Sequence, residues 1–305
     1  MSGITKIELL PLGKSLAVSQ LPLSEPFVNR LVVADTYVDG AEKWDAQPWG
    51  WSTELSGKEV LNIDHHAPTE SMRRQVSSGN LAIEYVHQRG ALTPDQDRVL
   101  INHCDCDSII SAAILAGLAP ADDRLGRAVI AADHTGAADP IADALQPLEA
   151  LRDLDLSLLT LQALLDDTPL PEPALRLRAQ REQEREQWRE LVQAGSRFGW
   201  ADGVAWLEWP RRVPGELLVT LLPDAWAILT ATPGQRGGWV TKLRLGPAAP
   251  AGLSLSELGI PDFDPGYGGR WNAGSNTRGG GGPLAPEAYA NELAAAIHRW
   301  AAKRS

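Results

Sequence analysis

Two short stretches of the sequence concentrate aspartate and histidine. "VLNIDHHAPTE" places Asp64, His65 and His66 directly after an apolar run, and "LINHCDCDSIISAAIL" carries a second group further along the chain. Carboxylate oxygens and imidazole nitrogens bind divalent manganese, magnesium, zinc or iron, whereas a thiolate site would need more cysteines than Cys104 and Cys106. These residue types therefore indicate a metal site to which both stretches would contribute.

The second group has a regular spacing. His103, Asp105 and Asp107 stand at alternate positions, and on an extended strand end alternate side chains share one side. We therefore expect these three residues to face a common site. Cys104 and Cys106 would face the other way, which favours small buried residues over zinc ligands.

Four apolar runs predict the strands that position these residues: "RLVVADTYVDG", "EVLNIDHH", "RVLINHCDCDS" and "GRAVIAADHTG". Two stretches have helical spacing, "SGNLAIEYVHQRG" up to Gly90 and "SIISAAILAGL" up to Gly117, the latter with Ser108 as its expected N-cap. Apolar strands separated by helices predict a parallel sheet covered on both faces. In such sheets ligands bind beyond the carboxyl ends of the strands.

Each of the four runs ends in residues that could bind a metal. An isolated aspartate at a strand end is usually a helix cap or turn residue, and a lone histidine is usually structural. Four such ends in one region, carrying Asp35, Asp64, His103 and Asp133, favour a single metal site over separate structural roles.

The remaining sequence predicts a connector and a second domain. Residues 1–150 would form the first domain, residues 151–197 a helical connector, and residues 198–305 the second domain. The connector's charged segment, "ALRLRAQREQEREQWRELVQAG", predicts an exposed helix. "VAWLEWP", "ELLVTLL", "AWAILTATP" and "WVTKLRLG" predict strands of a second, smaller sheet. The predicted fold class is α/β, with a parallel-sheet N-terminal domain and a smaller α+β C-terminal domain.

The second domain contains a glycine-rich segment, "GYGGRWNAGSNTRGGGG", followed by a helix with Tyr289, Leu293, Ile297 and Trp300 on one face. Glycines leave backbone N–H groups open to an anion, and a helix N-terminus favours one. The segment also carries side chains that pair with phosphate. The alternative is a flexible linker. Our candidate substrate-binding residues are Gly269, Arg270, Asn272, Ser275, Asn276 and Arg278.

Composition limits the classes of partner. The net charge of -11 over 305 residues disfavours long nucleic acids, whose binding depends on lysine and arginine. It leaves open a small phosphorylated substrate or a short oligonucleotide. We expect no membrane partner, because no run is long enough to cross a bilayer and the N-terminus lacks signal-peptide features. Two cysteines in poor disulfide geometry favour a cytoplasmic location. The sequence is also compatible with a homodimer.

The motifs resemble those of the DHH phosphoesterase superfamily. "VVADT", "NIDHH" and "AADHTG" are similar to its successive motifs, and "NHCDCDSIISA" is similar to its opening motif. The order departs from the family, because the opening motif here falls after "NIDHH". Either the strand order is permuted or one of the similarities is accidental. In the second domain Gly269-Arg270 stands where the family has glycine-histidine.

The resemblance implies a two-metal site, with manganese the expected ion and magnesium or another divalent ion as alternatives. The implied metal ligands are Asp35, His65, His103, Asp105, Asp107 and Asp133. Asp35 would bridge the ions, His66 would orient the phosphoryl group, and Asp64 would fix the histidines. Arg270 and Arg278 of a DHHA1-like C-terminal domain would neutralise phosphate.

The expected activity is metal-dependent hydrolysis of a phosphoester or phosphoanhydride. The substrate would be a short oligonucleotide, cyclic dinucleotide, nucleotide or polyphosphate. One alternative is a nucleotide- or phosphate-binding protein that retains the fold without turnover. Another is a mononuclear metal hydrolase that acts on substrates without phosphate, and the number of metal ions per chain separates it from the two-metal interpretation.

Overall fold

A computed structural model describes residues 5–67, 69–195, 198–211, 213–234 and 237–304. The chain divides into two compact units. The first comprises Met1–Asp133 and Ala138–Glu182, and the second comprises His134–Ala137 and Gln183–Ser305. The domain boundaries at residues 150 and 197 stay predictions from sequence.

The described part of the first unit contains a six-stranded sheet in the order β1-β6-β2-β5-β4-β3. Strands β1, β6, β2 and β5 run parallel, and β4 and β3 are antiparallel additions at one edge. The bounds are Lys6–Leu9 (β1), Arg30–Ala34 (β2), Asp45–Gln47 (β3), Gly50–Leu55 (β4), Lys58–Ile63 (β5) and Asp97–Ile101 (β6). The predicted parallel sheet is therefore confirmed, with β1 and the β3–β4 hairpin as additions that the sequence analysis missed.

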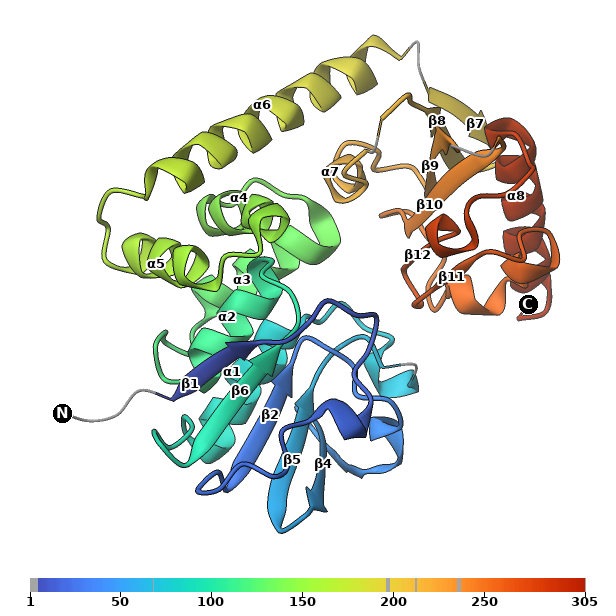
Figure 1. Ribbon diagram of the computed structural model, residues 1–305. Coiled ribbons are helices and arrows are strands. Elements are labelled where there is room, and N and C mark those ends of the chain that lie inside the picture. The colour runs from blue at the N-terminus through green and yellow to red at the C-terminus, as the bar shows by residue number, and fades with distance from the viewer. Residues whose placement is uncertain (1–4, 68, 196–197, 212, 235–236, 305) are drawn as a thin grey trace. The chain divides into compact units, whose positions relative to one another are not determined.

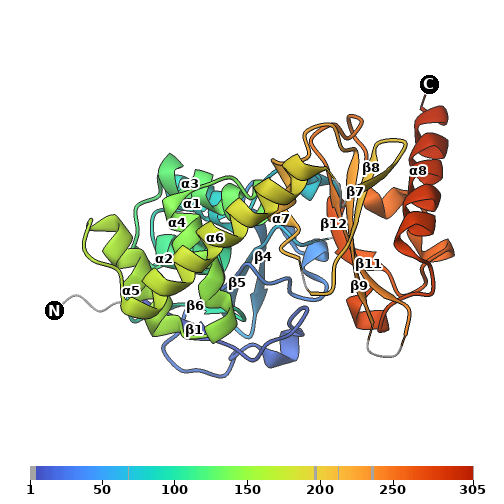
Figure 2. The same cartoon turned by 90° about the horizontal axis from the view of Figure 1, so that it is seen from above.

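The sheet is covered differently on its two faces. Helices α1 (Ser78–Arg89) and α2 (Cys106–Leu115) lie on one face, and α3 (Asp123–Ile130) packs against both of them (Figures 1 and 2). The N-terminal loops cover the other face, where Leu16, Leu21 and Val38 pack against apolar side chains of β2, β5 and β6. Apolar residues on both faces explain why the central strands read as continuous hydrophobic runs.

The central strands end at one edge of the sheet. Strands β5, β2 and β6 are neighbours and run in the same direction, so the residues that follow them lie side by side. Asp35 follows β2, Asp64 follows β5 and His103 lies just beyond β6. The opening-motif segment thus reaches the same edge as "NIDHH" although its place in the sequence differs from the family order.

The fourth predicted strand is wrong. Residues of "GRAVIAADHTG" form the end of α3 and a π-helical turn, Ala131–Thr135. Asp122 caps α3 by accepting a hydrogen bond from the Leu125 N–H, and Leu125, Ala128 and Val129 are buried at helical spacing. Asp133 therefore lies in the turn that follows a helix and not at the end of a strand.

Three further helices follow, α4 (Pro140–Leu145), α5 (Leu154–Leu165) and α6 (Glu172–Ala194). The expectation that α6 is exposed holds only in part, because Arg181 and Arg185 are buried. Arg181 places Nε 3.4 Å from Oδ1 of Asp143, which is also buried. A buried arginine needs such a partner, so the charged residues of α6 do not all face solvent.

The described part of the second unit contains another six-stranded sheet, β11-β12-β10-β9-β8-β7, so the expectation of a smaller second sheet is wrong in strand number. The strands are Phe198–Ala201 (β7), Val204–Glu208 (β8), Ala227–Pro233 (β9), Trp239–Leu245 (β10), Gly268–Gly269 (β11) and Ala273–Ser275 (β12). Helix α8 (Pro286–Ala302) packs against β7, β8 and β9 through Tyr289, Leu293, Ile297 and Trp300, as its spacing predicts (Figure 2).

The predicted strand "ELLVTLL" is wrong, because Glu216–Val219 forms the short helix α7. Leu217 and Leu218 are buried in an apolar cluster with Trp188 and Ile228, so the apolar run reflects burial of a helical turn. Among the described residues, no helix combines the length and the apolar character that spanning a membrane requires.

Candidate metal centre

Asp35 lies at the centre of the predicted site, directly after β2. Its backbone has a φ of 49°, an uncommon left-handed conformation for a residue other than glycine, and its side chain is 1% exposed. The hydroxyl of Ser78 donates to Oδ1 over 2.9 Å, and the hydroxyl of Ser108 donates to Oδ2 over 2.7 Å. Two helix N-termini thus hold this carboxylate in one orientation.

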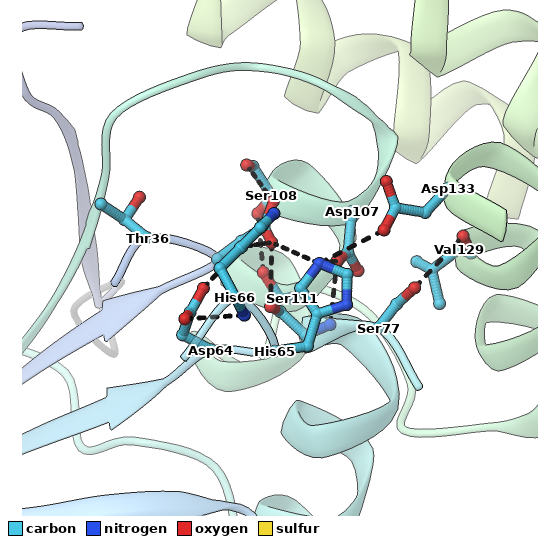
Figure 3. A network of polar contacts seen from close by, with 12 residues as sticks. Thr36, Asp64, His65, His66, Ser77, Asp107, Ser108, Ser111, Val129 and Asp133 are labelled. Carbon is cyan, nitrogen blue, oxygen red and sulfur yellow. Dashed lines mark hydrogen bonds and ion pairs between the residues drawn. The ribbon is translucent and has the colours of Figure 1, made fainter. Parts of the chain in front are cut away.

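His65 collects carboxylate oxygens around one ring nitrogen. Its Nε2 lies 3.2 Å from Oδ2 of Asp133, 3.7 Å from Oδ1 of Asp35 and 3.8 Å from Oδ2 of Asp107. The other ring nitrogen, Nδ1, lies 2.6 Å from the carbonyl oxygen of Val76. A carbonyl can only accept, so Nδ1 carries a proton and Nε2 is the nitrogen that faces the carboxylates (Figure 3).

His103 forms a second group of the same kind. Its Nε2 lies 3.0 Å from Oδ2 of Asp35 and 3.4 Å from Oδ2 of Asp105. One potential ligand atom from each of Asp35, His103 and Asp105 lies within 4.8 Å of the others, as does one from each of Asp35, His65 and His66. Asp35 therefore belongs to both groups and turns a different oxygen toward His65 and toward His103.

Asp107 has a further structural task at this centre. It is 2% exposed, and its Oδ2 and Oδ1 atoms accept hydrogen bonds from the backbone N–H groups of Ser78 and Gly79, over 2.8 and 2.7 Å. These N–H groups belong to the first turn of α1, whose dipole favours a carboxylate. A Cβ at Gly79 would lie 3.2 Å from Oδ1 of Asp107 and 2.8 Å from Val129, so glycine permits this close approach.

The charges of the site are strongly coupled. Burial by itself would raise the pKa of Asp35, but the hydrogen bond from His103 and the nearby histidines hold that pKa well below its usual range. Burial opposes the charged form of His103, yet Asp105 and Asp35 raise the pKa of His103 to about 12. The pKa of Asp107 is raised well above its ordinary value, first by burial and then by the neighbouring charges of Asp35, Asp133 and Asp105.

These donors fit divalent cations. Burial and the neighbouring carboxylates together raise the pKa of Asp107, so the charged form of this cluster needs positive charge beside it, and imidazole nitrogens of the kind that bind metals lie among the carboxylates. The two donor groups contain oxygen and nitrogen, which suits manganese. Both cysteines of the predicted "HCDC" segment are buried, as expected, and neither belongs to a donor group among the described residues.

His66 and Asp64 form a pair at the rim. The Nδ1 atom of His66 lies 2.8 Å from Oδ1 of Asp64, and the backbone N–H of His66 donates to Oδ2 over 2.9 Å. Asp64 is fully buried, whereas the side chain of His66 is 39% exposed. The two histidine rings cross at 88° with centroids 4.2 Å apart (Figure 3). The adjacent histidines therefore reach different parts of one site, His65 the buried carboxylates and His66 the exposed rim.

The local geometry of the second stretch differs from the expectation. Strand β6 ends at Ile101 and α2 begins at Cys106, so alternate positions do not share an extended strand here. Asp105, not Ser108, is the N-cap, because its Oδ1 accepts the Ser108 N–H over 2.9 Å. The hydroxyl of Ser108 is thereby available to Asp35.

The glycine-rich segment of the second unit contains both structural and accessible groups. Asn276 is fully buried, accepts the Thr241 N–H over 2.7 Å and donates to the Trp239 carbonyl over 3.2 Å, so its side chain closes the turn onto β10. Asn272 places Nδ2 3.1 Å from Nδ1 of His134 within the same unit. Gly269 is exposed, and Arg270 and Ser275 are partly buried. The side chain of Arg278 lies outside the described residues.

Sequence reasoning missed several residues that hold the ligands. Ser78 was not expected to contact Asp35, and its place at the start of α1, after a stretch of polar residues, was the available signal. Asn62 lies inside β5, where a buried amide is unusual. It donates to the carbonyls of Val33 and Thr36 and accepts the Val38 N–H, fixing the turn that carries Asp35.

No protein-family model matches the sequence, and no curated protein matches it. Among solved structures, the chain is similar to a pGpG-specific phosphodiesterase, PggH from Vibrio cholerae, with 11% identity over 90% of this chain and 99% of that chain, at a TM-score of 0.42. It is also similar to exonuclease RecJ bound to manganese, with 15% identity over 95% of this chain and 79% of that chain, at a TM-score of 0.40. At TM-scores this low, neither similarity bears on the function; the residues of this chain do.

Proposed function

We propose that the chain is a member of the DHH phosphoesterase superfamily that hydrolyses a phosphoester or phosphoanhydride bond with two divalent metal ions, most readily manganese. One observation carries the proposal. The two carboxylate oxygens of Asp35 face different donor groups, Oδ1 toward His65 and Oδ2 toward His103, as a carboxylate that bridges two ions must.

The donor sets follow from the contacts around each histidine. His65, Asp107 and Asp133 would hold one ion together with Asp35, and His103 and Asp105 would hold the other with the same carboxylate. Bound there, such ions polarise phosphoryl oxygens and lower the pKa of water near neutral pH.

The protein's own groups would complete the chemistry. His66, held by Asp64 at the exposed rim, would orient a phosphoryl oxygen and stabilise its charge. Its Nδ1 faces the Asp64 carboxylate, which stabilises the protonated ring as negative charge gathers on the substrate. Asp107 would keep the site rigid by holding the first turn of α1, which also presents the Ser78 hydroxyl to Asp35.

The substrate would be small or short. The site lies in an acidic chain, so affinity for phosphate would come from the ions and from a few local cations rather than from a basic surface. Arg270 and the backbone N–H groups of the glycine-rich segment would supply the remaining phosphate contacts, with Arg278 at the same segment.

Hydrolysis with purified protein tests the proposal. With manganese, the protein should release phosphate or mononucleotide from at least one of a linear dinucleotide, a cyclic dinucleotide, a short oligonucleotide and polyphosphate. Asp35→Asn should abolish release, and Asp39→Asn, which changes an exposed carboxylate in the same loop, should not. Ligand-dependent thermal stabilisation without product from any substrate, in protein that binds two ions, would support the non-catalytic alternative instead.

A further inference from the structure

Asn102 lies between β6 and His103 and is 1% exposed. Its side-chain Nδ2 donates to the carbonyl of Gly13 over 3.0 Å, and its Oδ1 accepts the Thr36 hydroxyl over 2.9 Å. The same Oδ1 lies 2.5 Å from Nδ1 of His103. A buried amide with every polar atom in use has a defined position and a defined orientation.

The Gly13 carbonyl decides which way this amide points. A carbonyl oxygen only accepts, so the amide nitrogen must face Gly13 and the amide oxygen must face His103. The reverse orientation would place two acceptors against each other at Gly13. Because Oδ1 also only accepts, Nδ1 of His103 carries a proton, and Nε2 is the nitrogen directed at Asp35.

The surrounding backbone holds Asn102 itself. Arg152 donates from Nη1 to the Asn102 carbonyl over 2.9 Å and from Nη2 to the Leu10 carbonyl over 3.0 Å. This guanidinium therefore ties the ends of β1 and β6 together at the point where His103 leaves the sheet. The amide of Asn102 cannot move away from the ring without breaking its hydrogen bonds with Gly13 and Thr36, and its backbone is held by Arg152.

The corresponding contact at His65 is made by backbone. Its Nδ1 faces the Val76 carbonyl, which no substitution removes. Nδ1 of both histidines is thus held by an acceptor, but only His103 depends on a side chain. The two donor groups should therefore respond differently to a single substitution.

We propose that Asn102 is a positioning residue for one of the two metal ions: its amide oxygen holds His103 in the tautomer and ring orientation that direct Nε2 at Asp35 and Asp105. The inference rests on the proposed two-metal function, and it deepens that function by separating the ions. Loss of such a hydrogen-bonding partner typically weakens metal affinity by about 10–100-fold. The group around His65 should keep its ion.

Metal titration of three variants tests the proposal with a readout other than activity. Manganese binding to metal-free protein should show two ions for the parent, and Asn102→Leu should weaken one of them by about 10–100-fold while leaving the other unchanged. Asn102→Asp keeps an acceptor toward His103 but loses the donor to the Gly13 carbonyl, so it should retain both ions and unfold at a lower temperature than the parent. Thr36→Val removes the other hydrogen bond to the same oxygen and should also retain both.

Three results would overturn the proposal: parent-like affinity for both ions in Asn102→Leu, equal weakening of both ions, or the same loss in Asn102→Asp and Thr36→Val. Thermal unfolding of each metal-free variant shows whether it is folded. If Asn102→Leu does not fold, zinc-loaded parent protein provides a second measurement: a nitrogen NMR spectrum should show the His103 proton on Nδ1, and a proton on Nε2 would refute the assignment. Parent protein that binds two ions but hydrolyses nothing defeats the proposed activity and leaves this inference standing.

Discussion

The Oδ2 atom of Asp35 lies 3.0 Å from Nε2 of His103. These residues follow different strands of the sheet, β2 and β6, which are neighbours and run parallel. The contact therefore joins the ends of two strands whose sequences are far apart. Because the opposite oxygen of Asp35 faces His65, this contact divides the acidic cluster into two donor groups that share one carboxylate.

Asp35→Asn should weaken the binding of both metal ions. An amide offers one weak oxygen ligand and no charge, so it cannot bridge two cations. Manganese affinity should fall by at least ~10²-fold at both positions, since substitutions even outside the ligand set reach that scale. Calorimetric titration measures it, with Asp39→Asn as the matched control. Retention of two tightly bound ions by Asp35→Asn would show that another residue bridges them.

His66→Gln should lower turnover and leave the metals in place. His66 lies close enough to Asp35 and His65 to share an ion, but its Nδ1 contacts the Asp64 carboxylate and its ring stands at the exposed rim, so we assign it to the substrate. We expect kcat to fall by about 10²-fold, the scale of one acid–base or charge-stabilising group. Steady-state kinetics with metal analysis on the same sample measure both quantities. His87→Gln, on the exposed face of α1, is the control. Loss of an ion in His66→Gln would make His66 a ligand.

Metal-free protein should lose stability as the pH rises above about 6.5. Burial opposes charge on His103, but carboxylates raise its folded-state pKa from 6.5 to about 12. Below pH 6.5 the ring is protonated in both the folded and the unfolded protein, whereas above pH 6.5 only the folded protein keeps the proton, so the stability that it contributes falls as the pH rises. The raised pKa of Asp107 acts in the same direction. Urea unfolding in chelator at about pH 6.5 and 8.5 measures the fall. The assignment would be contradicted by a free energy of unfolding that is the same at both pH values, or by a His103→Gln variant whose free energy of unfolding falls as much as that of the parent.

Arg270→Ala should raise KM and leave metal binding intact. A charged hydrogen bond to phosphate is worth about 1.5–3 kcal/mol, which corresponds to roughly a tenfold or greater rise in KM. Kinetics at saturating manganese measure the change, and Arg299→Ala, at an exposed position of α8, provides a control of equal charge. An unchanged KM for Arg270→Ala would remove the glycine-rich segment from substrate binding.

The sequence predicted the parallel sheet well because its strands carry an unambiguous signal. Strands β2, β5 and β6 are apolar on both faces and end in acidic residues or histidine, so their direction and their common edge follow from pattern alone. The gathering of Asp35, His65 and His103 follows from that edge. The pattern could not place Asp133, because the short apolar run before it fits a strand and a buried helix equally.

The details of the centre could not be read from the sequence. Whether Asp105 or Ser108 caps α2 depends on where β6 stops, and a boundary shift of a few residues exchanges their roles. The tasks of Ser78 and Asn102 arise from contacts between segments that the sequence separates widely. Hydrogen-bonding partners of this kind are set by tertiary packing rather than by local pattern.

Anomalous diffraction from crystals of the parent protein grown with manganese tests the central claim most directly. The account predicts two manganese peaks, one beside Oδ1 of Asp35 and Nε2 of His65, and one beside Oδ2 of Asp35 and Nε2 of His103. A single peak, or two peaks that do not share the Asp35 carboxylate, would contradict it.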